Sequence, residues 1–109
     1  MKLHVAVDLH TLEKAIAMVH KVAPFVDIIE AGTPLIKQEG LRIISILKEC
    51  FPEKLILADM KTMDAGGLEA KLAYDAGADL VTVLAVATTP PSEVPWRWPT
   101  GEANGWWST

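Results

Sequence analysis

Residues 54–66, KLILADMKTMDAG, place a short apolar run directly before a group of charged side chains. The run KLILAD is rich in large aliphatic residues and ends at Asp59, which is typical of a buried strand. Lys61 and Asp64 follow shortly after it. The stretch therefore predicts a strand whose carboxyl end carries two acids and a lysine.

Residues 1–86 repeat this arrangement of an apolar run followed by a helical pattern. LHVAVD ends at Asp8, VDIIE ends at Glu30, and DLVTVLAV forms a fourth run. This alternation is typical of βα units with a parallel sheet. The ends at Asp8, Glu30 and Asp59 are 22 (30 minus 8) and 29 (59 minus 30) residues apart, near the roughly 30 residues per unit of an eight-unit barrel. We predict an α/β fold: the N-terminal portion of a (β/α)8 TIM barrel, with about three and a half βα units.

The segments between the runs carry helix signals. Thr11 is placed to cap the first helix, Pro34 fits the first turn of the second, and Gly77 marks the end of the third. The expected apolar stripes are Leu12, Ala15, Ile16 and Val19; Leu41, Ile44 and Leu47; and Leu68, Leu72, Ala73 and Ala76. An open doubly wound sheet has similar spacing, but no G-x-G-x-x-G follows the first run, which counts against a dinucleotide-binding fold.

Composition narrows the classes of partner. The chain has 109 residues, half of them hydrophobic, and a net charge of -4 without a Lys/Arg cluster. This argues for one small domain and against nucleic acid or an anionic membrane as the main partner. Cys50, the one cysteine, cannot form an internal disulfide and is expected to be a small buried hydrophobe. No pattern of a signal peptide or membrane span is visible, so a cytoplasmic location is expected.

Asp8, Glu30 and Asp59 each end a different predicted strand. In parallel sheets and barrels the carboxyl ends of the strands carry the chemistry, so the three carboxylates are expected to converge there. An acid after a strand is also a common helix cap or turn former, but Thr11 is a better-placed cap than Asp8, and Glu is a poor cap. Glu30 and Asp59 would suit Mg²⁺, and Lys61 shares a face with Asp59 if the strand continues. His4 is expected to be packed or paired structurally.

The pattern DMKTMD resembles the orotidine 5'-phosphate decarboxylase superfamily, whose members are (β/α)8 barrels acting on sugar phosphates. Within it, VAVDL, VDIIEAGTPLI, LADMKTMDAG and AGADLVTVL are similar to the 3-hexulose-6-phosphate synthase family. These enzymes are aldehyde lyases of the ribulose monophosphate pathway, which condense formaldehyde with D-ribulose 5-phosphate through a Mg²⁺-stabilised enediolate. The resemblance covers about residues 1–86, less than half of a family chain.

The resemblance implies a role for each charged residue. Glu30 and Asp59 match Mg²⁺ ligands, and Asp8 matches an acid that contacts the substrate. Lys61 matches the lysine beside the enediolate, and Asp64 matches an acid that reaches the neighbouring subunit's site in a homodimer. Asp59, Lys61 and Asp64 are thus the expected catalytic residues, and Asp8, Lys61 and Asp64 the expected substrate-binding ones. Phosphate-binding and proton-transfer groups of the family come largely from later strands.

Residues 88–109 differ in character, since they contain all four tryptophans and four of the seven prolines. A shifted reading of the codons from Pro90 onward forces Ala at Trp98/Pro99 and Val at Trp106/Trp107, and it allows a helix followed by a valine-rich strand. We therefore interpret residues 1–87 as a partial barrel and 88–109 as a frameshifted tail. The alternative is a genuine Trp/Pro-rich segment that binds a partner. The downstream nucleotide sequence in all three frames decides between them.

Three functions stay open at this point. The first is the synthase, with the 109-residue chain alone expected to be truncated and to show little or no activity. The second is the sister enzyme 3-keto-L-gulonate-6-phosphate decarboxylase, although KTMDAG favours the synthase. The third is a non-catalytic half-barrel fragment that only associates.

Overall fold

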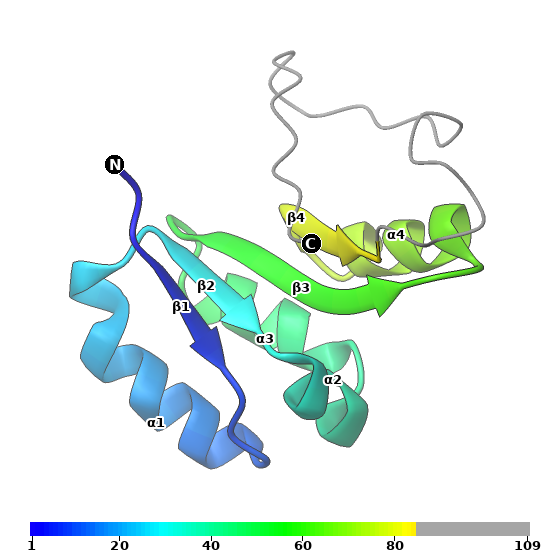
Figure 1. Cartoon of the computed structure of the whole chain (residues 1–109). Coiled ribbons are helices and arrows are strands. Elements are labelled where there is room, and N and C mark those ends of the chain that lie inside the picture. Colours follow the sequence, from blue (N-terminus) through cyan, green and yellow to red (C-terminus); the bar gives the residue numbers. More distant parts are fainter. Residues whose placement is uncertain (85–109) are drawn as a thin grey trace.

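The computed structural model describes residues 1–84 (Figure 1). The predicted domain boundary after residue 87 and the predicted tail at residues 88–109 lie outside that range. The elements are β1 His4–Val7, α1 Leu12–Val22, the 3-10 turn η1 Ala23–Phe25, β2 Ile28–Ala31, α2 Thr33–Glu39, α3 Arg42–Cys50, β3 Leu55–Thr62, α4 Gly66–Asp75 and β4 Leu80–Val83. Within residues 1–84, no helix combines the length and apolar character needed to cross a bilayer.

The four strands form one parallel sheet in the order β1-β2-β3-β4. Each new strand joins the same side of the sheet, which is the winding of a barrel, whereas the strand order of a doubly wound sheet reverses. Figure 1 shows the strands side by side and twisted, with helices between consecutive strands. The prediction of three and a half βα units in an α/β fold is confirmed.

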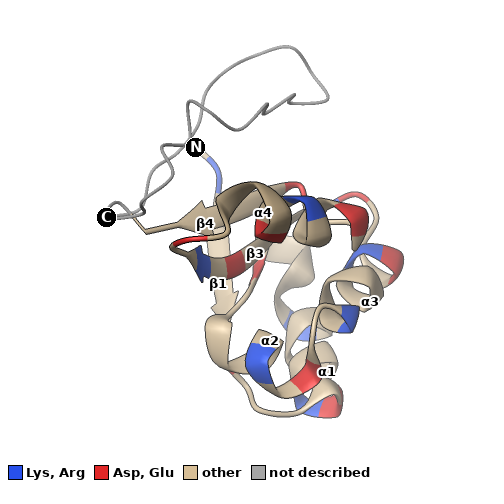
Figure 2. Cartoon of the chain, turned by 90° about the vertical axis from the view of Figure 1, so that its right-hand side faces the viewer, with Lys and Arg blue, Asp and Glu red and all other residues tan. Residues whose placement is uncertain are grey.

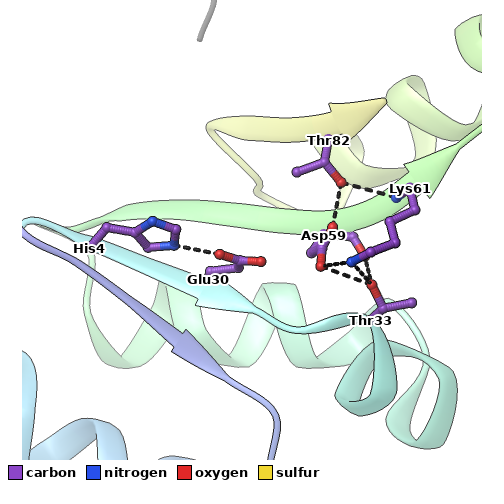
Figure 3. A network of polar contacts seen from close by, with 6 residues as sticks. All are labelled: His4, Glu30, Thr33, Asp59, Lys61 and Thr82. Carbon is purple, nitrogen blue, oxygen red and sulfur yellow. Dashed lines mark hydrogen bonds and ion pairs between the residues drawn. The ribbon is translucent and has the colours of Figure 1, made fainter. Parts of the chain in front are cut away.

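The two faces of the sheet differ because side chains alternate along each strand. Val7, Ile29, Ile56 and Ala58 point to one face and are fully buried. They pack against the helices, whose fully buried residues include Ala15, Val19, Ile43, Ile44 and Leu47. Figure 3 shows the other face, which carries polar side chains and has the helices behind it. The open face therefore presents the polar residues of the sheet.

The helix boundaries follow the local signals, with one correction. Thr11 caps α1 by accepting a hydrogen bond from the Lys14 N–H, and Pro34 lies in the first turn of α2. The single helix predicted to run from Pro34 through Leu47 is wrong, because the chain breaks into α2 and α3 at Gly40. Gly40 has a φ of 70°, a left-handed conformation that glycine adopts without steric cost.

Two predictions of burial are wrong. Leu68 and Leu72 are 64% and 46% exposed, because α4 turns its small residues Ala70 and Ala73 toward the sheet instead. Cys50 is exposed at the end of α3 rather than buried. Periodicity identifies the apolar positions of these helices, but packing decides which of them face the core.

Asp79, just before β4, links the amino ends of β3 and β4 and also pairs with Lys48 of α3. Asp79 accepts hydrogen bonds from Lys48 Nζ and from the Ile56 N–H, each 2.8 Å long. The Asp79 N–H in turn donates to the Ile56 carbonyl at 2.8 Å. The opposite end of the same strand pair is irregular, since the register shifts between Ala58 and Thr62. The carboxyl end is therefore the distorted part of the strand pair, and it holds the charged residues.

Candidate active site

Asp59 is the centre of a polar network on the open face (Figure 3). The residue is only 8% exposed. Thr82 of β4 donates to Oδ1 at 2.6 Å, and Thr33 at the start of α2 lies 2.9 Å from Oδ2. Lys61 Nζ forms an ion pair with the same Oδ2. The carboxylate is therefore contacted from three elements and held in one orientation.

The protonation of Asp59 reflects these partners. Burial alone would raise the pKa of the carboxyl, but hydrogen bonds from Lys61, Thr82 and Thr33 outweigh burial and lower the pKa below its ordinary value. Asp59 is therefore ionised at neutral pH. An ionised, oriented carboxylate is the form that ligates a hard cation.

Lys61 contacts Asp59 and has an unusual backbone conformation. It is two residues further along β3 and has a φ of 48°, in the left-handed region that residues with a Cβ rarely adopt. Its Nζ also donates to Thr33 Oγ1 at 2.8 Å. Since Asp59 and Thr33 are its two partners among residues 1–84 and an ammonium group has three N–H donors, one donor is left for a ligand. Half of the Lys61 side chain, 53%, is exposed, so a ligand on the open face can reach it.

Glu30 lies next to this network on β2. Its side chain is 14% exposed and its Oε2 is 2.5 Å from Nε2 of His4. Burial raises the pKa of the Glu30 carboxyl, His4 lowers it, and the charge of the neighbouring Asp59 raises it again, with a net upward shift. The prediction that His4 is paired is confirmed. Glu30 and Asp59 thus lie on adjacent strands and face the same open side of the sheet. The charge of Asp59 disfavours the ionised form of Glu30.

Of the three carboxylates predicted to converge, Glu30 and Asp59 face the same side of the sheet, and the convergence of Asp8 with them stays a prediction. Among residues 1–84, no three acidic, histidine or cysteine side chains form a group that could hold a metal ion. β1 ends at Val7, so Asp8 follows the strand, and its carboxylate lies against the backbone of Gly32. Asp64 is exposed in the bend between β3 and α4. The structure therefore brings together Glu30, Asp59 and Lys61 and leaves Asp8 and Asp64 outside this network.

The predicted strand ends also need correction in detail. β2 continues to Ala31 and β3 to Thr62, so Glu30 and Asp59 lie within their strands. Figure 2 shows acidic and basic positions next to one another on β3. Lys61 was predicted to share a face with Asp59 if the strand continues past Met60, and β3 does continue past it.

Sequence reasoning missed Thr33 and Thr82 as members of the site. A signal existed for Thr82, because it is a polar residue within an apolar run. It lies two positions after Leu80 and therefore on the same face of β4 as Leu80, which pairs with Leu57 of β3. Thr33 had a weaker signal, since a threonine before Pro34 is common at any helix start. Which hydroxyls meet Asp59 depends on strand order, which the sequence pattern alone leaves open.

Comparisons with known proteins agree with this architecture. A family model described as "Orotidine 5'-phosphate decarboxylase / HUMPS family" matches residues 1–91. A 3-hexulose-6-phosphate synthase from Mycobacterium gastri is 60% identical over 87 residues, which are 80% of this chain and 42% of that protein.

Solved structures give the same result. A crystal structure of 3-hexulose-6-phosphate synthase is 61% identical with a TM-score of 0.75, and the match covers 76% of this chain and 40% of that one. KGPDC from Streptococcus mutans, solved in complex with a sugar phosphate, is 42% identical with a TM-score of 0.77, covering 80% and 40%.

The chain spans about two fifths of the length of these relatives. The sequential parallel sheet, the matched family model and the identity to these relatives lead to one conclusion: the chain belongs to the orotidine 5'-phosphate decarboxylase / HUMPS family and has part of the TIM-barrel fold.

Proposed function

We propose that this chain carries the cation-binding and charge-stabilising part of a 3-hexulose-6-phosphate synthase-like aldehyde lyase, which condenses formaldehyde with D-ribulose 5-phosphate. The observation that carries the proposal is the grouping of Glu30, Asp59 and Lys61 on one open face of the sheet. The high identity to a synthase supports the choice of reaction. The relative solved in complex with a sugar phosphate supports that class of substrate.

The donor set fits Mg²⁺. Mg²⁺ typically takes one or two carboxylates and completes its shell with water and substrate oxygens, so Glu30 and Asp59 suffice. The charge of Asp59 raises the pKa of Glu30, and a cation between the two carboxylates would relieve that repulsion. Bound Mg²⁺ would supply stabilisation of negative charge on substrate oxygens.

Lys61 would stabilise the charge that develops during the reaction. A base from the later strands would take a proton from carbon 1 of ribulose 5-phosphate to give an enediolate, whose carbon attacks the carbon of formaldehyde while the protonated base returns the proton to the formaldehyde oxygen. The Lys61 ammonium, already fixed by Asp59 and Thr33, needs little reorganisation to donate to the enediolate oxygen. Asp8 and Asp64 are proposed to contact the substrate, with Asp64 acting across a homodimer.

The activity belongs to the complete protein of the family. The match covers 42% of the synthase from Mycobacterium gastri, and phosphate-binding groups are expected in the remainder of such a chain. We therefore propose that residues 1–109 alone show little turnover. A cytoplasmic location is part of the same proposal.

The first experiment measures cation binding by the 109-residue chain, with Mn²⁺ as a paramagnetic substitute for Mg²⁺. Binding that Mg²⁺ displaces, and that Asp59→Asn abolishes, is expected. Asp75→Asn is the matched control, because Asp75 is an exposed acid that pairs with Lys71 on the surface of α4. Equal loss of binding in both variants would contradict the site.

The second experiment measures formaldehyde-dependent consumption of ribulose 5-phosphate. The assay compares the chain alone with a hybrid in which the later strands of the Mycobacterium gastri synthase follow residue 84. Activity in the hybrid that Lys61→Gln abolishes is expected. Activity on 3-keto-L-gulonate 6-phosphate instead would select the sister decarboxylase, to which the 42% identity with KGPDC from Streptococcus mutans also points. Oligomers that bind neither Mn²⁺ nor sugar phosphate would indicate the non-catalytic fragment.

A further inference from the structure

Thr82 joins the two charged residues of β3 through a single hydroxyl group (Figure 3). Its Oγ1 donates to Asp59 Oδ1 at 2.6 Å and accepts from the Lys61 N–H at 3.0 Å. A hydroxyl has one proton and two lone pairs, a carboxylate oxygen accepts, and a backbone N–H donates. The direction of both hydrogen bonds is therefore fixed.

The Lys61 N–H is bonded where the β3–β4 ladder is irregular. The register shifts between Ala58 and Thr62, and regular pairing resumes where the Leu84 N–H donates to the Thr62 carbonyl at 2.9 Å. In between, Lys61 adopts its φ of 48° and donates to a side chain rather than to a carbonyl of β4. Strained backbone of this kind persists only where surrounding contacts hold it.

The Thr82 hydroxyl also determines which carboxylate oxygen of Asp59 contacts the other partners. Because Thr82 takes Oδ1, Oδ2 is the oxygen that faces Lys61 Nζ and Thr33. Thr33 cannot replace Thr82, since it contacts the far oxygen and the Asp59 carbonyl, 2.7 Å away, and not the Lys61 backbone. Thr82 alone among residues 1–84 bonds both the carboxylate of Asp59 and the main chain of Lys61.

We propose that Thr82 is a positioning residue of the active site. By holding the left-handed backbone of Lys61 and the orientation of Asp59 together, it fixes where the ammonium group stands relative to the carboxylate. The inference rests on the proposed function in so far as Asp59 and Lys61 serve the reaction. The local geometry that it assigns to Thr82 is testable independently of any activity.

The test compares Thr82→Val with Thr82→Ser in the full 109-residue chain, labelled for NMR. Valine keeps the shape and suits a strand, but it removes both hydrogen bonds, whereas serine keeps the hydroxyl. A residue with positive φ gives a strong intraresidue NOE between its amide and α protons. Thr82→Val is expected to lose this strong NOE at Lys61, and Thr82→Ser is expected to retain it.

A second readout is Mn²⁺ affinity. Thr82→Val is expected to weaken Mn²⁺ binding by about tenfold to hundredfold, the scale on which partners of metal ligands act, and Thr82→Ser to restore it. The matched control is Ser45→Ala, which removes a hydroxyl that donates to the Ala76 carbonyl at 2.8 Å, in contact with neither Asp59 nor Lys61. It is expected to change neither readout.

Three results would overturn the proposal. One is a Lys61 NOE that stays strong in Thr82→Val, and another is a Thr82→Ser variant that behaves like Thr82→Val. The third is a fold that collapses in Thr82→Val but not in Ser45→Ala, since the hydroxyl would then serve the fold as a whole. If the wild-type chain binds no Mn²⁺, the proposed function fails, while the NOE comparison still decides the role of Thr82.

Discussion

His4 Nε2 lies 2.5 Å from Glu30 Oε2, on two neighbouring strands of the open face. His4 pairs with Ile28 in the register of β1 and β2, so its side chain points to the same face as Glu30, two residues further along. Glu30 is thus flanked by a histidine on one side and by Asp59 on the other. Burial and the charge of Asp59 raise the pKa of Glu30, and His4 opposes both.

Replacing this histidine should move the Glu30 pKa in a known direction. In His4→Gln the partner that lowers the pKa of Glu30 is gone, so the pKa should rise further above its ordinary value. Titration of the Glu30 side-chain carbonyl carbon by ¹³C NMR measures this. His10→Gln, at an exposed position before α1, is the control. A Glu30 pKa that falls or stays in place in His4→Gln would contradict the assigned contact.

The sequence predicts the strands and the caps well, because both depend on local chemistry. Thr11 offers its side-chain oxygen to the first turn of α1, and Gly77, with a φ of 108°, ends α4 as a glycine after a helix should. Gly40 also adopts a left-handed conformation, and here that conformation contradicts the predicted single helix from Pro34 through Leu47. A glycine within an apolar periodic pattern can be tolerated in a helix or can break it, and here it breaks it.

The site is predicted less completely than the fold. Asp59 and Lys61 follow from spacing along one strand, which alternation describes. The carboxylate of Asp8 lies where the end of β1 approaches Gly32, a contact that the strand pattern does not predict. Thr82 was not predicted as a site residue, because its role depends on a register shift between β3 and β4. The apolar pattern of the sequence does not indicate such a shift.

Core truncation should separate buried from exposed leucines of the helices. Leu47 is fully buried, so Leu47→Ala removes packing and leaves a cavity, with an expected loss of about 2–5 kcal/mol in the free energy of unfolding. Leu68→Ala should cost less than about 0.5 kcal/mol, since this leucine is 64% exposed. Urea unfolding followed by circular dichroism gives both values. Equal losses would mean that Leu68 is buried in solution.

Gly32 should not tolerate a side chain. A Cβ there would lie 2.0 Å from Asp8 Oδ1 and 2.7 Å from the Val7 carbonyl oxygen. Gly32→Ala must therefore shift the backbone of β1 as well as Asp8, at an expected cost of about 1–3 kcal/mol.

Gly66→Ala is the matched control for this substitution, because a Cβ at Gly66 meets no atom within 4 Å and alanine favours the helix. In thermal unfolding, the melting temperature of Gly66→Ala should equal or exceed that of the wild type, and the melting temperature of Gly32→Ala should be lower. The reverse ranking would contradict the close approach of β1 to α2.

Acid stability should depend on Glu39. Its side chain accepts hydrogen bonds from Arg42 and from the Leu12 N–H, 3.2 Å away, and thereby joins the end of α2 to the start of α1. The Arg42 hydrogen bond, followed by that of Leu12, lowers the pKa of Glu39 below 4.5. Because the folded state holds the proton less tightly than the unfolded chain, this contribution is present above pH 4.5 and is lost as the pH falls through the folded pKa.

Glu39→Gln should therefore lower the urea midpoint at pH 7 and reduce the loss of stability between about pH 5 and pH 3. The control is Glu53→Gln, at an exposed turn position, which should keep the wild-type pH dependence. The two midpoints are measured at each pH by circular dichroism. Since Arg42 is mostly exposed, with 65% of its side chain accessible, added salt should weaken the Glu39 effect. A Glu39→Gln profile parallel to the wild type across this range would show that the link between α1 and α2 does not depend on the charge of Glu39.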